Sequence, residues 1–123
     1  MKITTIEQYV DAISKLDEKI EENYKNLNFN TKHNALIKKR QKITGGINMN
    51  IRLAETVYFI LLLSNNIETL ICTASHCLRL DIFTERSLEI LNSLSNNDEI
   101  GIHGFEAKTC LRLYRGEIPN RTL

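Results

Sequence analysis

Apolar residues recur at helical intervals through most of the second half of the chain, between Asn66 and Gly116. Three successive segments repeat them at steps of three or four residues, which places them on one face of an α-helix. Asn66 and Thr84 are typical N-caps, and Gly116 can take the left-handed conformation that ends a helix. The pattern therefore predicts three helices. Their buried stripes are expected to be Ile67, Leu70, Ile71, Ala74, Cys77, Leu78 and Ile82; then Leu88, Ile90, Leu91 and Leu94; then Phe105, Ala107, Cys110, Leu111 and Tyr114.

The first half of the chain shows the same helical spacing. Thr4-x-x-Glu7 has the spacing of a capping box, and an apolar seam follows it as far as Leu27, so the first helix is predicted over about residues 5–27. Asn30 or Thr31 is expected to cap a second helix, which Gly45-Gly46 should stop.

A third helix is predicted over residues 51–64, capped by Asn50. Its run VYFILLL is apolar on every side, and a helix that is hydrophobic all round is typical of a buried one. We therefore expect this helix at the centre of the core.

These elements together predict an all-α protein of five to six helices. Short connections favour antiparallel pairs, arranged as a short HEAT-like α-solenoid or as an irregular helical bundle. We expect residues 1–123 to form a single helical domain, in which the helix over 5–27 packs on a helical-hairpin core over 31–116. Pro119 should end any continuation, which leaves a short C-terminal tail over 117–123.

Composition narrows the class of protein. The chain is 42% apolar and 25% charged, as in ordinary globular proteins, and its longest apolar run is too short to span a membrane. A soluble, cytoplasmic protein with no membrane partner is the expectation. Cys72, Cys77 and Cys110 fall on or beside the apolar stripes, which favours buried, reduced thiols. The alternative is a zinc site that uses Cys72 and His76 at i, i+4.

No catalytic constellation is visible in the sequence. The motifs of nucleophile elbows and zinc peptidases are missing, and Ser75, His76 and Cys77 are adjacent, so they point to different faces of one helix. His103 stands near a helix start and is expected at the polar surface. We predict that the protein is not an enzyme and that it uses no cofactor, no metal and no small-molecule substrate.

Charge is distributed unevenly along the chain. Residues 32–52 hold six basic residues and no acidic one, whereas residues 53–104 hold seven acids and two bases. The basic helix over 32–42 favours either a solvated face or a nucleic-acid contact. Its candidate contact residues are Lys38, Lys39, Arg40 and Lys42. The outer face of the first helix mixes acids with lysines, and it is either solvated or an acidic contact surface.

The C-terminal motifs resemble those of a small helical family. The run Thr73-Ala74-Ser75, the helix motif Leu88-Glu89-Ile90-Leu91 and the closing helix with Phe105, Ala107, Leu111 and Gly116 resemble the HEAT-like immunity proteins of bacterial contact-dependent inhibition systems. The resemblance covers about the last two-thirds of the chain. It implies a protein that binds and neutralises a cognate toxin domain, commonly a nuclease such as a tRNase.

On that interpretation, acidic side chains replace substrate phosphates and block the toxin's active site or substrate-binding site. The predicted partner-binding residues are Glu55, Glu68, Asp81, Glu85 and Glu89, with Asp17, Glu18, Glu21 and Glu22 of the first helix as the other face. The alternative function is a nucleic-acid-binding or regulatory module that uses the basic helix.

Overall fold

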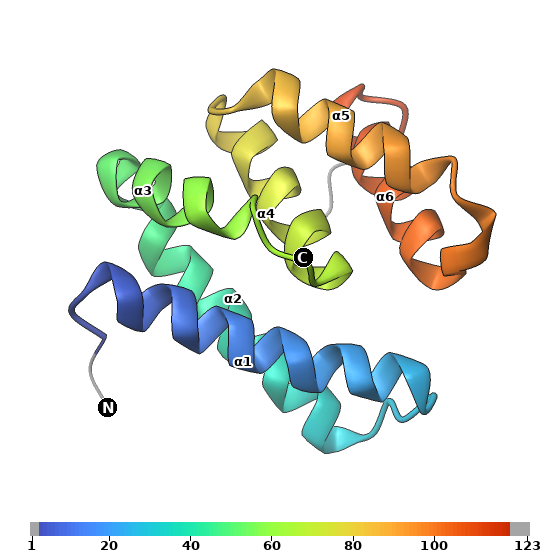
Figure 1. Ribbon diagram of the computed structural model, residues 1–123, viewed down its shortest axis with the longest axis horizontal. Coiled ribbons are helices and arrows are strands. Elements are labelled where there is room, and N and C mark those ends of the chain that lie inside the picture. Colours follow the sequence, from blue (N-terminus) through green and yellow to red (C-terminus); the bar gives the residue numbers. More distant parts are fainter. Residues whose placement is uncertain (1–2, 119–123) are drawn as a thin grey trace. The chain divides into compact units, whose positions relative to one another are not determined.

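The computed structural model describes residues 3–118, apart from the side chain of Asp98. Within these residues it contains α-helices and one 3-10 turn but no strand, which confirms the all-α fold (Figure 1). The elements are α1 (Ile6–Lys25), α2 (Thr31–Asn48), α3 (Ile51–Leu61), α4 (Ile67–Leu80), α5 (Thr84–Ser95), η1 (Asp98–Ile100) and α6 (Ile102–Tyr114). None of the described helices is both long enough and apolar enough to span a membrane. Most of the predicted tail, residues 119–123, lies outside the described residues.

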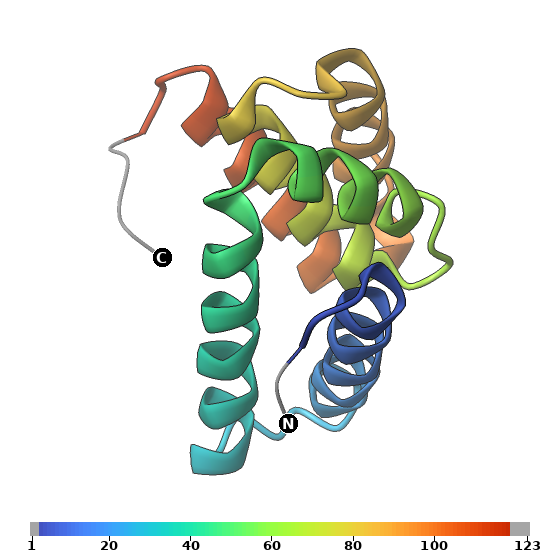
Figure 2. The same cartoon turned by 90° about the vertical axis from the view of Figure 1, so that its left-hand side faces the viewer.

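The chain forms two compact units, residues 1–69 and residues 70–123. In the first unit α1 packs against α2, and α3 packs against both of them (Figures 1 and 2). In the second unit α5 packs along α6. The arrangement of all helices in one domain stays a prediction.

Asparagine caps begin three of the helices, as predicted. The side-chain Oδ1 of Asn30 accepts a hydrogen bond from the backbone N–H of His33 at 3.1 Å. Asn50 and Asn66 cap α3 and α4 in the same way. Each cap satisfies an amide that has no partner inside its helix.

Two of the predicted caps are wrong by one residue. The capping box of α1 uses Thr5 and Gln8 in place of Thr4 and Glu7. Thr84 is the first residue of α5, and the cap before it is Phe83, which takes a left-handed conformation with φ 47° and makes no side-chain cap bond. A capping box can use either glutamine or glutamate. The sequence pattern therefore fits both Thr4 with Glu7 and Thr5 with Gln8.

Left-handed residues end α1, α4 and α6. After α6 the N–H of Glu117 donates to the carbonyl of Arg112 at 2.9 Å, across Gly116 at φ 74°. This confirms the predicted role of Gly116 in a Schellman motif. A Schellman motif contains two backbone hydrogen bonds. The same two bonds occur around Leu27 and around Asp81, which have φ 51° and φ 57°. Neither residue is a glycine, so no glycine signal marked these two ends.

The predicted stop at Gly45-Gly46 is wrong, because α2 continues through both glycines to Asn48. A glycine lowers helix stability by only about 1 kcal/mol, and packing of the buried residues His33, Thr44 and Ile47 along α2 offsets that cost. The predicted buried stripe of α6 is also partly wrong. Phe105 and Tyr114 are exposed, while His103 and Gly104 are buried beside Ala107 and Leu111.

Candidate functional site

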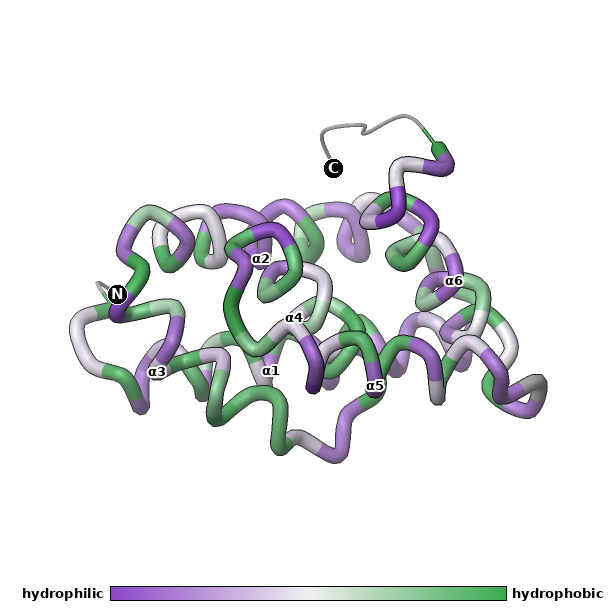
Figure 3. The backbone as a smooth tube through the Cα atoms, turned by 90° about the horizontal axis from the view of Figure 1, so that it is seen from above, coloured by the Kyte–Doolittle hydropathy of each residue, from purple (hydrophilic) through white to green (hydrophobic). Residues whose placement is uncertain are grey.

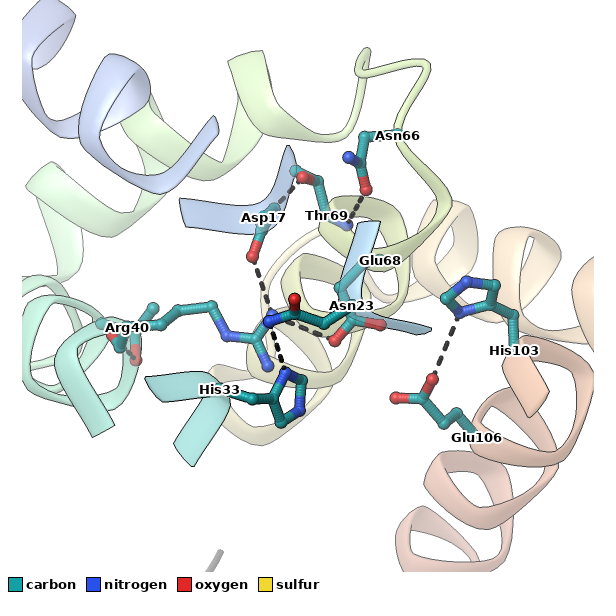
Figure 4. Close-up of polar contacts among 10 residues, drawn as sticks. Asp17, Asn23, His33, Arg40, Asn66, Glu68, Thr69, His103 and Glu106 are labelled. Carbon is teal, nitrogen blue, oxygen red and sulfur yellow. Dashed lines mark hydrogen bonds and ion pairs between the residues drawn. The ribbon is translucent and has the colours of Figure 1, made fainter. Parts of the chain in front are cut away.

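A buried ion network in the first unit joins α1, α2 and the first turn of α4 (Figure 4). The guanidinium of Arg40 on α2 donates to Asp17 on α1 at 2.8 Å and to Glu68 on α4 at 3.0 Å. The hydroxyl of Thr69 donates to the second carboxylate oxygen of Asp17 at 2.7 Å. Both carboxylate side chains are fully buried, and the Arg40 side chain is 12% exposed.

This network corrects three site predictions. Asp17 and Glu68 were expected on a partner-binding face, and Arg40 on a basic face, yet all three turn towards one another inside the first unit. Their physical role is structural, because a buried charge is tolerated only where an opposite charge and hydrogen bonds compensate it.

The other predicted acidic residues divide between the two units. In the first unit Glu18, Glu22 and Glu55 are exposed, and Glu21 is half-buried. In the second unit Asp81, Glu85 and Glu89 follow one another at four-residue steps and are exposed. Of this row, Asp81 accepts a hydrogen bond from the Thr84 hydroxyl and Glu89 pairs with Arg86 at 3.5 Å. Glu85 and Glu89 therefore lie one turn apart on one side of α5, and Asp81 precedes the helix.

The most conspicuous surface in the first unit is the outer face of α3, although the apolar sequence of this helix predicts a place inside the core. Val57, Tyr58 and Leu61 are buried, whereas Phe59 is 57% exposed and Leu63, just after the helix, is 69% exposed. We define the α3 face as six of its outward residues, Arg52, Glu55, Thr56, Phe59, Ile60 and Leu63. A run in which most residues are apolar has too few polar positions to mark the exposed side of a helix. The sequence therefore could not show which side of α3 faces solvent.

The histidines have structural partners. The Nδ1 of His33 lies 3.1 Å from the side-chain amide of Asn23, and its ring packs edge-on to Tyr24 and Phe29. His103 was expected at the polar surface, but it is buried, with Nδ1 3.2 Å from Glu106 (Figure 4). Both imidazoles therefore act in packing and hydrogen bonding.

None of the three described cysteines forms a disulfide, and Cys77 is fully buried. Burial raises the pKa of the Cys77 thiol from 9.0 to about 11, and the neighbouring Ser87 side chain acts in the opposite direction. A thiol with so high a pKa is a poor nucleophile and a poor metal ligand. Cys72 and Cys110 are half-buried. Within either unit taken alone, the described residues bring no three histidine, cysteine or carboxylate ligand atoms within 4.8 Å of one another.

The remaining predicted basic residues are on the surface. Lys38, Lys39 and Lys42 are exposed on α2, where Lys38 and Lys42 lie on the opposite side of the helix from Arg40 and Lys39 lies about a quarter-turn from it. The candidate sites are thus three separate surfaces: the α3 face, the acidic row of α5 and the lysines of α2. Comparison of the chain with protein-family models, with curated proteins and with solved structures finds no match.

Proposed function

We propose that this chain is a binding protein of the immunity type, which neutralises a cognate toxin domain by docking the α3 face onto it. The observation that carries the proposal is the exposure of Phe59 and Leu63 beside Glu55 on one face of a helix. Contiguous exposed apolar side chains with charged neighbours are typical of protein-binding surfaces. The resemblance of the C-terminal motifs to immunity proteins supplies the class of partner.

Phe59 and Leu63 have the chemistry of interface anchors. Burial of such a side chain contributes roughly 1.5–3 kcal/mol relative to full exposure, and more than half of each one is still in water. The residues recur at four-residue steps from Glu55, so a groove on the partner can receive them together. Ile60, which is 40% exposed, widens the apolar part of this face.

Charge indicates the kind of groove. Glu55 lies one turn before Phe59 and Arg52 lies one turn before Thr56, so an apolar groove with a cationic group facing Glu55 and a hydrogen-bond acceptor facing Arg52 would match the α3 face. A nuclease has cationic groups because it binds nucleic-acid phosphates. The acidic row of α5 carries no large apolar anchor, and we assign it a role in electrostatic steering of the partner. Buried aromatic anchors with charged rims are the usual distribution of energy in protein interfaces.

The test is coexpression with a candidate toxin domain, the product of the gene adjacent to this one, with growth and copurification as readouts. The wild-type chain should protect the cells and copurify with the toxin. The double variant Phe59→Asp with Leu63→Asp should lose both properties, because two charges would enter the apolar groove. Phe105→Asp on α6 is the matched control, since Phe105 is 70% exposed and lies outside the α3 face.

Circular dichroism of each variant tests whether the protein still folds. Because the substituted positions are exposed, helix content should be unaltered. Equal protection by wild type and the double variant would refute the α3 face. If the wild-type chain neither binds nor protects, the immunity function itself is wrong.

A further inference from the structure

We infer that α2 carries a second interaction surface, which binds the phosphate backbone of duplex nucleic acid. We define the α2 lysine face as Lys32, Lys38, Lys39 and Lys42, all of which are exposed. This surface shares no residue with the α3 face, and it does not depend on the toxin-binding function.

The helical register places these four lysines together. Lys38 and Lys42 are one turn apart, and Lys32 and Lys39 are two turns apart, so all four fall on the outward half of α2. With a rise of about 1.5 Å per residue, the face extends roughly 15 Å along the helix. The buried residues His33, Thr44 and Ile47 occupy the opposite side.

These lysines are available for a ligand. Across residues 3–118 none of the four takes part in an ion pair, and α2 contains no acidic residue. The exposed lysines of α1, in contrast, have Asp11, Glu18 and Glu22 as exposed neighbours on their own helix. Like charges that are not compensated within the fold attract a polyanion and release its counterions.

Small residues between the lysines leave space for a sugar–phosphate strand to approach α2 closely. Ala35, Gly45 and Gly46 share the outward side of α2, and the space around both glycines is open, since a Cβ added at either one would meet no atom within 4 Å. Figure 3 shows hydrophilic positions recurring along α2. A sugar–phosphate strand could therefore approach the helix without steric obstruction.

The residue types select one class of polyanion. Single-stranded nucleic acid is bound with exposed aromatic rings on which bases stack, and α2 has no aromatic residue other than the buried His33. A membrane-surface helix needs large apolar side chains that insert into lipid, whereas the exposed residues of α2 are polar, charged, alanine or glycine. Duplex phosphates need only positioned cations, so binding should be independent of sequence.

The experiment measures fluorescence anisotropy of a duplex DNA of about 20 base pairs and a matching RNA duplex, titrated with the full chain at several salt concentrations. Four lysine–phosphate contacts predict that log K falls with log salt at a slope of about −3 to −4. The triple variant Lys38→Ala, Lys39→Ala, Lys42→Ala should bind at least about tenfold more weakly, with a slope near about −1.

The matched control is Lys15→Ala, Lys19→Ala, Lys25→Ala on α1, which removes the same charge from exposed positions of the same unit. The control should keep the wild-type slope. Equal weakening in both triple variants would show that only net charge matters, and absence of binding to either duplex would also overturn the inference. Stronger binding to a single strand or to anionic vesicles than to either duplex would reject the chosen class of ligand.

Discussion

At the residue scale, Arg40 compensates two buried charges of the first unit. Its guanidinium contacts two fully buried carboxylates from different helices, Asp17 and Glu68. Removal of the cation would leave both charges buried against each other. The penalty for breaking a buried pair in this way is about 3–5 kcal/mol.

We therefore expect Arg40→Ala to lower the free energy of unfolding by about 3–5 kcal/mol in urea titrations. Lys39→Ala is the control, because the neighbouring lysine is exposed and should change stability by less than about 0.5 kcal/mol. If the two variants unfold at similar urea concentrations, Arg40 does not hold the carboxylates together.

Cys77 gives a prediction about reactivity and pH. Burial raises the pKa of its thiol to about 11, so at about pH 8 it should react with a thiol reagent much more slowly than the half-buried Cys72 and Cys110. The unfolded chain loses this proton near pH 9.0 while the folded chain keeps it. Folding stability from this thiol is therefore fully present below pH 9.0 and decreases between pH 9.0 and about 11.

Labelling with the thiol reagent, followed by mass spectrometry, measures the reaction rate of each of the three cysteines. Urea titrations of wild type and Cys77→Ala across the same pH range isolate the contribution of this thiol. Labelling of Cys77 as fast as the other two, or a stability difference that does not change with pH, would mean that the site is open to solvent.

At the element scale, α2 shows how packing overrides a local stop signal. Gly45 and Gly46 lie inside the helix, and neither has the positive φ of a helix-ending glycine. Since the space at both Cβ positions is open, Gly45→Ala with Gly46→Ala should stabilise the protein by roughly 0.5–1 kcal/mol per site. Thermal unfolding measures the effect, and a lower melting temperature would indicate that the glycines end the helix after all.

The sequence was most informative where a local interaction determines the structure. Asn30, Asn50 and Asn66 marked helix starts because each cap bonds an amide three residues away. Leu27 and Asp81 end helices in the left-handed conformation without any glycine signal, and both side chains are exposed. Helix existence and type were therefore predictable, whereas several ends were not.

The candidate site was less predictable, since charge alone does not show which side of a helix faces water. Asp17 and Arg40 fitted an acidic and a basic face equally well in the sequence, and only the packing of α1 against α2 shows that they pair. Phe59 lies in an apolar run that has no polar positions to mark the exposed side of the helix. Its exposure therefore depends on which side of α3 packs against other helices.

At the scale of the whole molecule, acidic and basic contacts are assigned to different surfaces. The α3 face combines Glu55 with apolar anchors, α5 carries the acidic row, and α2 carries lysines without acids. A protein partner and a polyanion can therefore be recognised by different residues of one chain. This separation makes the two proposed binding activities separable by mutation.

Binding of the toxin domain by the α3 face is the basis of the proposed function, and isothermal titration with the purified toxin domain measures that binding. Wild type and Phe105→Asp should bind with similar affinity, and Phe59→Asp with Leu63→Asp should weaken binding at least about 100-fold, the equivalent of about 2.7 kcal/mol. Unchanged affinity of the double variant, with its helix content intact, would show that the toxin domain binds elsewhere on the chain.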